Sequence, residues 1–559
     1  PHDQAIHLDA MTRISALSDL LTLPQPRFNV CIGFDDCSGL NQGLGLLTVP
    51  ERPPHMANPP RHSCVIARRL SGVLAVVCLL LGASSASAQG IPEDRVLLLY
   101  NSVNADSLAV RNMYIAAHPD VRELDLNNAS LSPKDPTDLG NITRTQYMNA
   151  VRAPLLAYLS GMTETGAPLS EHIIAIATTR GLPARIQGPN EFELFSSRSS
   201  LECELALVQQ DLSLAGTGDF TTLFEGTIDN PYHFMVNQPI TSFDRSGITS
   251  QKSFTLVDNQ AWESSKLTPG DMYLVCRLDS APSDDATALE NIQALINRSL
   301  NLSFIPADVQ ALLDEYGSEF DQLDDDGGLF FPSDEDFENA RTVLNSIGVP
   351  TFHDETFTFW EGDTIPDQVR PLITLGTYGE NHDLMGSGAN PPGAGVYLST
   401  FTNLHPAAIF ISYESFNGNS IINGLPRGNQ EQAMNFIANG GSFTVAHVAE
   451  PFTFTVADLE MLTSNLLVNG MTFAEAAYSS IPALSWQNTP IGDPLATVVM
   501  MEEPVVVGDL NDDDTVNGTD LAILLSVWGT DGSGTGADLN GDGVVNGADL
   551  ATLLSNWGA

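Results

Sequence analysis

The chain has 559 residues, with 23 Lys and Arg against 69 Asp and Glu, so that its net charge at pH 7 is −46. A surface this acidic repels phosphate backbones and anionic lipids, which argues against nucleic acid and membrane surfaces as partners. Because 43% of the residues are hydrophobic, the chain can still bury a core, and its length predicts two or three domains.

The first recognisable segment, residues 56–88, has the pattern of a secretory signal peptide. It starts at Met56, continues through a basic stretch into an apolar run over residues 73–81, and ends in small residues. The apolar run is shorter than the roughly 20 residues that a membrane-spanning helix needs. We therefore expect this segment to be cleaved, leaving a secreted or cell-surface protein with no membrane span. Residues 1–55 have no such pattern, and we expect them to be an upstream segment translated in error.

Two cysteines, Cys203 and Cys276, remain after such a cleavage. In an oxidising compartment they can form a disulfide. In the alternative interpretation, both are small buried apolar residues. The sequence leaves both interpretations open.

Strand-like and helix-like segments alternate between residues 95 and 500. Apolar runs typical of buried strands occupy residues 95–100, 172–179, 272–279, 407–415 and 440–448. Helical periods occupy residues 143–162, 201–212, 431–439, 459–470 and 473–480. This alternation predicts an α/β fold with a mostly parallel sheet flanked by helices. We divide it into two α/β halves, residues 89–350 with a helical insert and residues 351–504, followed by a linker over residues 505–508.

Two copies of one pattern, offset by 29 residues, form the C-terminal segment at residues 509–559. In each copy, acidic or amide side chains stand at alternate positions of a loop, and an apolar helix-like stretch ending in Trp-Gly follows. Calcium takes six to eight oxygen ligands, and a twelve-residue loop supplies them from positions 1, 3, 5, 7, 9 and 12. The predicted ligands of two calcium ions are Asp509, Asn511, Asp513, Thr515, Asn517 and Asp520 in the first loop, and Asp538, Asn540, Asp542, Val544, Asn546 and Asp549 in the second.

Position 6 of such a loop makes a sharp turn that suits glycine. Gly543 meets this requirement in the second loop, whereas Asp514 is a strained substitute in the first. The alternative is a solvated acidic tail. The matched apolar stretches ending at Trp528 and Trp557 argue against it, because a disordered tail has no reason to repeat a bulky apolar face.

This segment closely resembles a type I dockerin, a pair of calcium loop–helix units. The resemblance implies a small all-α domain folded around calcium, and a cohesin-like domain of another surface protein as its partner. Dockerins often accompany polysaccharide-degrading enzymes, so the resemblance also makes polysaccharide a candidate substrate for the large domain.

Residues 95–500 resemble a family of exported bacterial proteins of unassigned function, found mainly in species with exosortase-type surface sorting. The matching stretches include RVLLLYN, ATTRGLPARI, YLVCRLD and SWQNTPIGDPL. Because that family has no established reaction, the resemblance implies an architecture more than a chemistry.

The expected sheet and the Gly-Asp-Pro sequence at residues 492–494 also look like caspase-like and gingipain-like peptidases. Those enzymes need a His at one strand end and a Cys at the next, because the thiolate must lie within hydrogen-bond reach of its base. The corresponding stretches here, residues 412–415 and 446–447, contain no cysteine. The sequence therefore argues against a cysteine protease.

The predicted catalytic residues of the large domain are His447, Glu450 and Asp493. His447 and Glu450 follow a predicted strand, where α/β sheets place their sites, and Asp493 in the Gly-Asp-Pro turn can converge on them. Together they would form an acid/base group or a weak metal site. In the alternative interpretation, each residue is structural.

Two other groups combine residue types that bind metals. Glu380, His382 and Asp383 lie in a Gly- and Pro-rich loop of 19 residues, which is long enough to be typical of a functional loop. Residues 353–355, His-Asp-Glu, form the second group, which we expect to be solvated.

The leading interpretation is an exported modular protein, in which an α/β domain of unassigned chemistry carries a calcium-binding docking module. The first alternative is a secreted hydrolase that acts on the O-glycosyl bonds of polysaccharide. The second is a caspase-like pseudo-peptidase that has been reused for binding.

Overall fold

The computed structural model describes residues 90–131, 141–187, 198–209, 228–230, 232–233, 272–281, 285–315, 336–356, 358, 360–362, 364–365, 370–379, 397–421, 433–451, 455–503 and 506–558. The predicted upstream segment, the predicted signal peptide and the loop with Glu380, His382 and Asp383 lie outside the described residues. Within the ranges given, no helix is both long enough and apolar enough to cross a membrane.

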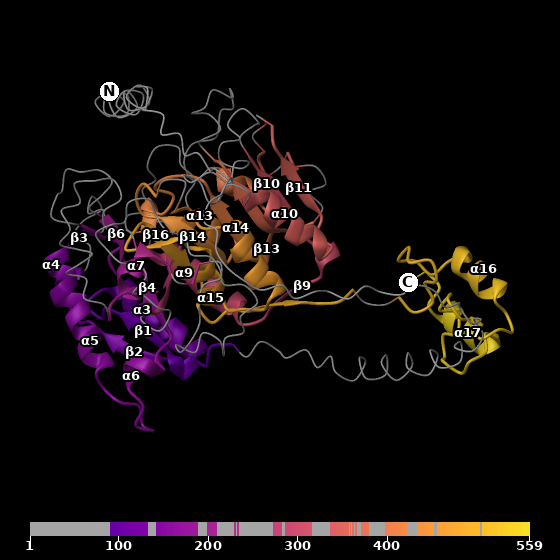
Figure 1. Cartoon of the computed structure of the whole chain (residues 1–559), viewed down its shortest axis with the longest axis horizontal. Helices are drawn as coiled ribbons and strands as arrows, with labels where there is room; N and C mark the ends of the chain where they lie inside the picture. Colours follow the sequence, from indigo (N-terminus) through magenta and orange to yellow (C-terminus); the bar gives the residue numbers. More distant parts are fainter. Residues whose placement is uncertain are drawn as a thin grey trace, which may run out of the picture. The chain divides into compact units, whose positions relative to one another are not determined.

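The large domain is built on a ten-stranded sheet, which Figure 1 shows with helices on both faces. In spatial order its strands are β11 (Thr351–Asp354), β10 (Gln310–Asp314), β12 (Leu372–Thr377), β13 (Leu404–Ser412), β14 (Phe443–His447), β16 (Asn488–Ile491), β8 (Leu274–Leu278), β4 (Ala175–Thr179), β1 (Val96–Tyr100) and β2 (Arg122–Asp125). Neighbouring strands pair in parallel, except that β14 and β16 pair antiparallel. The prediction of an α/β fold with a mostly parallel sheet is confirmed.

The remaining strands are short, and the longest helices described, α9 and α3, have 15 and 13 residues. The helices are α3 (Ala105–Ala117), α4 (Arg144–Gln146), α5 (Ala153–Leu159), α6 (Leu169–His172), α7 (Leu201–Ala206), α9 (Asp285–Ser299), α10 (Asp336–Ser346), α12 (Tyr397–Thr400), α13 (Ala433–Ala438), α14 (Leu459–Thr463), α15 (Phe473–Ser480), α16 (Gly518–Ser526) and α17 (Gly547–Ser555). The small strands are β3 (Asn141–Thr143), β5 (Arg185–Gln187), β6 (Arg198–Ser200), β7 (Ile228–Asp229), β9 (Leu302–Phe304), β15 (Ala483–Leu484) and β17 (Val498–Met500).

The central strands are apolar on both faces because helices cover both faces. The buried apolar side chains described in the large domain form two hydrophobic clusters. The first contains Leu313 of β10 and Ile411 of β13. The second contains their neighbours Leu312 and Phe410. Successive side chains of a strand point to opposite faces of the sheet, so at β10 and β13 the two clusters lie on opposite sides of it. In β1, by contrast, the successive residues Leu97 and Leu98 both belong to the first cluster. Phe337, in α10, belongs to the first cluster, which places this helix over that face.

Strands from both predicted halves of the domain form this sheet. β10 precedes residue 350, yet it pairs with β11 and β12, which follow that residue. β16 comes from near the end of the domain and lies between β14 and β8. The boundary placed at residue 350 therefore separates neighbouring strands of a continuous sheet.

A fully buried arginine, Arg277 of β8, is the centre of an ionic network within the domain. Its Nε atom donates to Oε1 of Glu202 at 2.9 Å, and its terminal nitrogens donate to the carbonyl oxygens of Leu182 and Pro183. The same Glu202 oxygen accepts a hydrogen bond of 2.8 Å from the hydroxyl of Thr178. These partners satisfy a charge that would otherwise be very unfavourable in the core.

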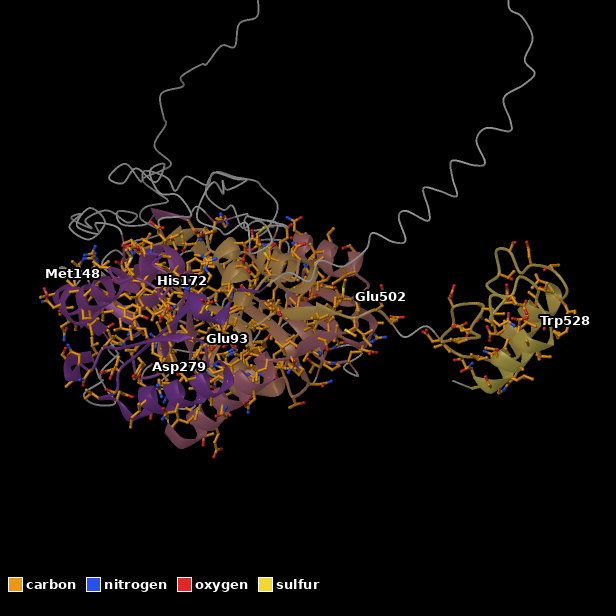
Figure 2. All side chains as sticks on the ribbon, turned by 90° about the horizontal axis from the view of Figure 1, so that it is seen from below. Glu93, Met148, His172, Asp279, Glu502 and Trp528 are labelled. Carbon is orange, nitrogen blue, oxygen red and sulfur yellow. The ribbon has the colours of Figure 1, made fainter. Side chains whose placement is uncertain are left out.

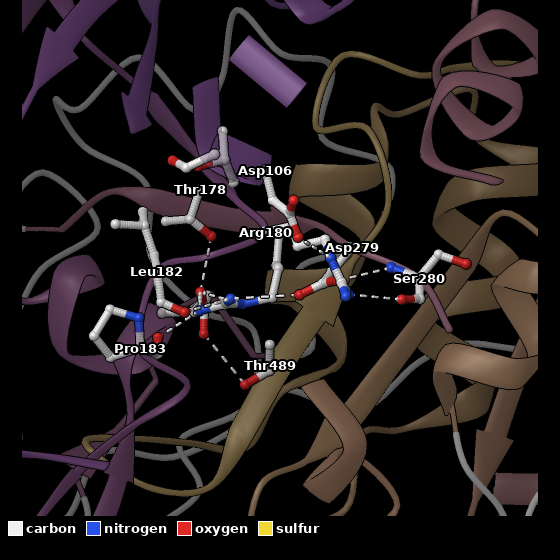
Figure 3. A network of polar contacts seen from close by, with 12 residues as sticks. Asp106, Thr178, Arg180, Leu182, Pro183, Asp279, Ser280 and Thr489 are labelled. Carbon is white, nitrogen blue, oxygen red and sulfur yellow. Dashed lines mark hydrogen bonds and ion pairs between the residues drawn. The ribbon is translucent and has the colours of Figure 1, made fainter. Parts of the chain in front are cut away.

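Arg180, directly after β4, forms the second part of this network (Figure 3). It pairs with the carboxylates of Asp106 at 2.9 Å and Asp279 at 3.0 Å. Burial raises the pKa of Asp279 even though both arginines oppose that effect. The network therefore ties the start of α3 to the ends of β4 and β8.

The C-terminal module has its own core. Each repeat is a loop followed by one helix, α16 or α17, and the two helices contact each other. The fully buried apolar residues are Val516, Leu524, Ala537, Val545 and Leu553. A core of this size is small for a domain that folds without help.

Candidate functional site

The first loop of the C-terminal module gathers carboxylate groups. Asp509, Asp513 and Asp520 each offer an oxygen, and these oxygens all lie within 4.8 Å of one another. Asp520 is buried, whereas Asp513 is exposed. A set of carboxylate oxygens on a short loop fits the hard ligands that calcium requires.

Both loops have the same hydrogen-bond pattern. Oδ2 of Asp509 accepts from the backbone N–H of Asp514, and Oδ2 of Asp538 accepts from that of Gly543, each at 2.7 Å. The acidic residue at position 12 repeats as well: Asp520 accepts from the N–H of Asn517 and Asp549 from that of Asn546. The predicted positions therefore hold equivalent places in the two loops.

The helices begin where each loop ends. Asn517 caps α16, and its side chain accepts from the N–H of Thr519, while the carboxylate of Asp520 accepts from the N–H of Asn517. Asn546 forms the same cap on α17. Caps of this kind satisfy N–H groups that have no partner within the helix.

The two loops differ in backbone strain. Asp512 and Asp514 have φ angles of 57° and 60° in the first loop, where Gly541 and Gly543 have 72° and 86° in the second. This left-handed region suits glycine, and aspartate tolerates it better than most other residues. The predicted strain at Asp514 is thus present, and Asp512 shares it.

We expect Gly543→Ala to lower the free energy of unfolding of the calcium-loaded module by about 1 kcal/mol, because a Cβ atom is unfavourable at a positive φ. A Cβ at Gly543 would meet no atom within 4 Å, so backbone strain alone is tested. The matched control is Gly547→Ala, which also has open space but no positive φ. Thermal unfolding of both variants checks this expectation, and an equal loss in the two would contradict it.

The module exposes matched apolar side chains at the ends of its two helices. Leu525 and Trp528 are 51% and 46% exposed, and their counterparts Leu554 and Trp557 are 50% and 48% exposed. Figure 2 shows Trp528 at the surface of the module. Aromatic residues exposed in this way are typical of protein-binding surfaces.

In the large domain, His447 ends β14 and is fully buried. Its Nδ1 atom lies 2.9 Å from the carbonyl oxygen of Glu414, which follows the neighbouring strand β13. Burial lowers the pKa of His447 to about 4, so its imidazole is neutral at neutral pH. Glu450 lies three residues further along and accepts a hydrogen bond from the hydroxyl of Ser415.

Asp493 does not join His447. Because β14 and β16 are antiparallel, His447 lies opposite Asn488, and Thr444 lies opposite Ile491. Asp493 therefore lies beyond the opposite end of β14 from His447, about 16 Å away along the strand direction at about 3.3 Å per residue. The structure thus does not form the predicted convergence of Asp493 on His447 and Glu450.

Asp493 instead holds the C-terminal end of α3. It accepts a hydrogen bond of 2.9 Å from the hydroxyl of Tyr114, and its other oxygen lies 3.0 Å from Nε2 of His118. Nδ1 of His118 lies 3.1 Å from Glu93. Asp493 also accepts from the backbone N–H of Leu495 and so closes its own turn. These contacts give Asp493 a structural role.

The stabilisation that His118 provides should be lost as the pH rises. Burial alone would lower the pKa of His118, but hydrogen bonds and negative charges of Asp493 and Glu93 outweigh burial and raise it. A group with a raised pKa stabilises the fold below its unfolded pKa of about 6.5, and this contribution disappears as the pH passes the folded pKa.

Urea unfolding of the large domain at about pH 6 and about pH 9 tests this expectation. The difference in unfolding free energy between the unchanged chain and His118→Gln should shrink at the higher pH. His405→Gln is the control, because burial lowers the pKa of His405 and its contribution is lost only as the pH falls. A His118→Gln difference that grows with pH would contradict the assignment.

Residues 353–355 are not all solvated as predicted, because Asp354 is buried and the side chain of His353 is only 3% exposed. Its Nε2 atom contacts Glu315, which follows β10, and lies 3.7 Å from Glu338 of α10. Its Nδ1 atom lies 2.8 Å from a guanidinium nitrogen of Arg341. Since arginine only donates, Nδ1 accepts and Nε2 carries the hydrogen toward Glu315. The His353 hydrogen bonds are therefore complete without a metal ion.

The two cysteines are free thiols, both buried. The thiol of Cys203 donates to the carbonyl oxygen of Asn488 at 3.2 Å, and Cys276 lies within β8. Burial raises the pKa of Cys203 to about 12 and raises that of Cys276 as well. Since only the thiolate is an effective nucleophile, neither cysteine is suited to covalent catalysis at neutral pH.

Comparisons with known proteins identify the C-terminal module. Residues 507–556 match the family model of the type I dockerin domain, which confirms the prediction for this segment. Such domains in general bind calcium. A search of curated proteins found no match to the chain. Among solved structures, the chain is distantly similar to the Arg-specific cysteine proteinase gingipain R, with 10% sequence identity, a TM-score of 0.37, and coverage of 73% of this chain and 78% of that chain.

Proposed function

We propose that this protein is exported and that its dockerin module binds a cohesin-type domain of another extracellular or cell-surface protein. The observation that carries the proposal is the repetition of one loop and helix geometry, with an exposed Leu and Trp in each copy. Two equivalent apolar surfaces on a small acidic module are suited to a protein partner. Binding of the dockerin module would attach the α/β domain to the partner protein. The chemistry of the α/β domain is unassigned.

We infer that each loop holds one calcium ion. The carboxylates and amides of residues 509–520 and 538–549 supply the oxygens, and the carbonyl groups of Thr515 and Val544 complete the two sets. Bound calcium neutralises the mutual repulsion of the loop carboxylates and fixes the loops on which the helices depend. The acidic composition and the segment at residues 56–88 support an exterior location, where calcium is abundant.

Binding to a panel of type I cohesin domains tests this function. We expect binding in calcium, no binding after chelation, and a loss of roughly 100-fold or more in affinity in the double variant Trp528→Ala, Trp557→Ala, as for central aromatic anchors. The control is Met162→Ala, since Met162 is an exposed apolar side chain of the large domain. Calcium-independent binding, or full binding by the double variant, would refute the proposed docking surface.

A second candidate function is acid/base hydrolysis by the large domain, centred on the fully buried His447. Its neutral imidazole lies at the carboxyl end of a strand, and Glu450 follows it closely, as a base and an acid would be placed. Asp493 is left out of this candidate site, because it lies at the other end of the strand pair. A screen of the calcium-loaded chain on polysaccharides and peptides tests the candidate. Activity that His447→Gln and Glu450→Gln both leave unchanged would exclude these residues.

A further inference from the structure

His447 and Asn488 face each other across the antiparallel pair β14–β16. The adjacent pair is hydrogen-bonded, because the N–H of Val448 donates to the carbonyl oxygen of Gln487 at 3.0 Å. His447 and Asn488 therefore form a non-hydrogen-bonded pair, in which side chains point to the same face and approach closely. Both side chains are fully buried.

The hydrogen on His447 is fixed by its partner. Nδ1 lies 2.9 Å from the carbonyl oxygen of Glu414, which only accepts hydrogen bonds, so Nδ1 carries the hydrogen. In a neutral imidazole the other nitrogen, Nε2, is then a bare acceptor. Burial keeps this imidazole neutral by lowering its pKa.

The orientation of the Asn488 amide is fixed in the same way. Its Nδ2 atom donates to the carbonyl oxygen of Thr455 at 3.0 Å, and a flipped amide would set two oxygens against each other. The other end of the amide is therefore the oxygen Oδ1.

Neither Nε2 of His447 nor Oδ1 of Asn488 has a hydrogen-bond partner among the described residues. Two acceptors cannot satisfy each other, and buried acceptors without donors are rare in folded proteins. Opposite side chains with Cβ atoms about 5 Å apart place one small molecule within reach of both. A small molecule that donates one hydrogen bond to Nε2 and another to Oδ1 would satisfy both acceptors.

We propose that His447 and Asn488 together bind one small ligand that donates a hydrogen bond to each of them, either a water molecule or an ammonium ion. The ligand lies on the His447 face of β14, and its hydrogens point to Nε2 and Oδ1. This site does not depend on the docking function. Water at this position would donate one hydrogen bond to the imidazole nitrogen and one to the amide oxygen.

A high-resolution crystal structure of the calcium-loaded chain is the first test. We expect one isolated density peak within about 3.2 Å of both atoms, the outer range of ordinary hydrogen bonds. An ordered pair with no peak, a direct contact between the two side chains, or a donor of the chain itself in that place would overturn the proposal.

The second test separates ammonium from water. Thermal unfolding in ammonium chloride is compared with unfolding in sodium chloride at the same ionic strength, for the unchanged chain, His447→Gln, Asn488→Leu and the control His405→Phe. Stabilisation of a few degrees by ammonium that is retained in His405→Phe and lost in both site variants identifies ammonium. No ammonium effect, or one that all variants share, identifies water when the density peak is present. Should a site variant fail to fold, the crystal structure of the unchanged chain still decides whether the site exists.

Discussion

Chelation of calcium is expected to unfold residues 507–558 in one cooperative step while the α/β domain stays folded. The module buries only five apolar side chains fully, and domains of this size generally need a metal or a disulfide to fold. Its carboxylates repel one another when no cation is present. At a calcium concentration 100 times the dissociation constant, each site adds about 2.7 kcal/mol of stability, so two sites supply about 5 kcal/mol.

Tryptophan fluorescence and circular dichroism during titration with a chelator measure this transition. Asp509→Ala and Asp538→Ala should each remove one ion and shift the transition to higher calcium concentration. Asp531→Ala is the control, because Asp531 is an exposed acidic residue between the two loops. Helix content in the module that does not change on chelation would contradict the calcium assignment.

Replacement of Arg277 by methionine is expected to destabilise the large domain by about 3–5 kcal/mol. The change leaves the carboxylate of Glu202 in the core without the cation that lies 2.9 Å away. It also removes the donors to the carbonyl oxygens of Leu182 and Pro183. A buried charge without a partner is far less favourable than the loss of a surface pair. Urea unfolding followed by circular dichroism measures the effect.

The control is Arg122→Met, which removes a pair with Glu164, whose side chain is 81% exposed. Exposed pairs contribute at most about 1 kcal/mol, so this variant should be nearly as stable as the unchanged chain. The double change Arg277→Met, Glu202→Leu should regain part of the loss, because no charge remains unpaired in the core. Equal losses from Arg277→Met and Arg122→Met would contradict the role given to the network.

The sequence predicts well what is decided by local pattern. The apolar runs at residues 95–100 and 272–279 form β1 and β8, because strands covered on both faces must be apolar throughout. The helical period at residues 143–162 forms α4 and α5, which a π-helical segment over Tyr147–Arg152 joins. The two calcium loops are recognisable because each carries its ligand pattern within twelve residues.

Local sequence pattern does not predict contacts between residues that are far apart in the chain. Glu315 and His353 are 38 residues apart, and only the pairing of β10 with β11 brings them together. The partner of Arg277 is 75 residues away in α7, so an arginine within an apolar run gave no sign of its role. The Gly-Asp-Pro turn that holds Asp493 carries no sign of strand direction, and the antiparallel direction of β16 separates Asp493 from His447.

The place of β16 in the sheet has a consequence for how this protein is made. This strand is contributed by residues 488–491, yet it sits in the interior of the sheet, between β14 and β8. A nascent or prematurely terminated chain that stops before it would leave both neighbours with open backbone edges, which favour aggregation. Completion of the sheet and synthesis of the dockerin module therefore come at nearly the same moment. A chain that carries the complete dockerin module therefore also carries every strand of the large sheet.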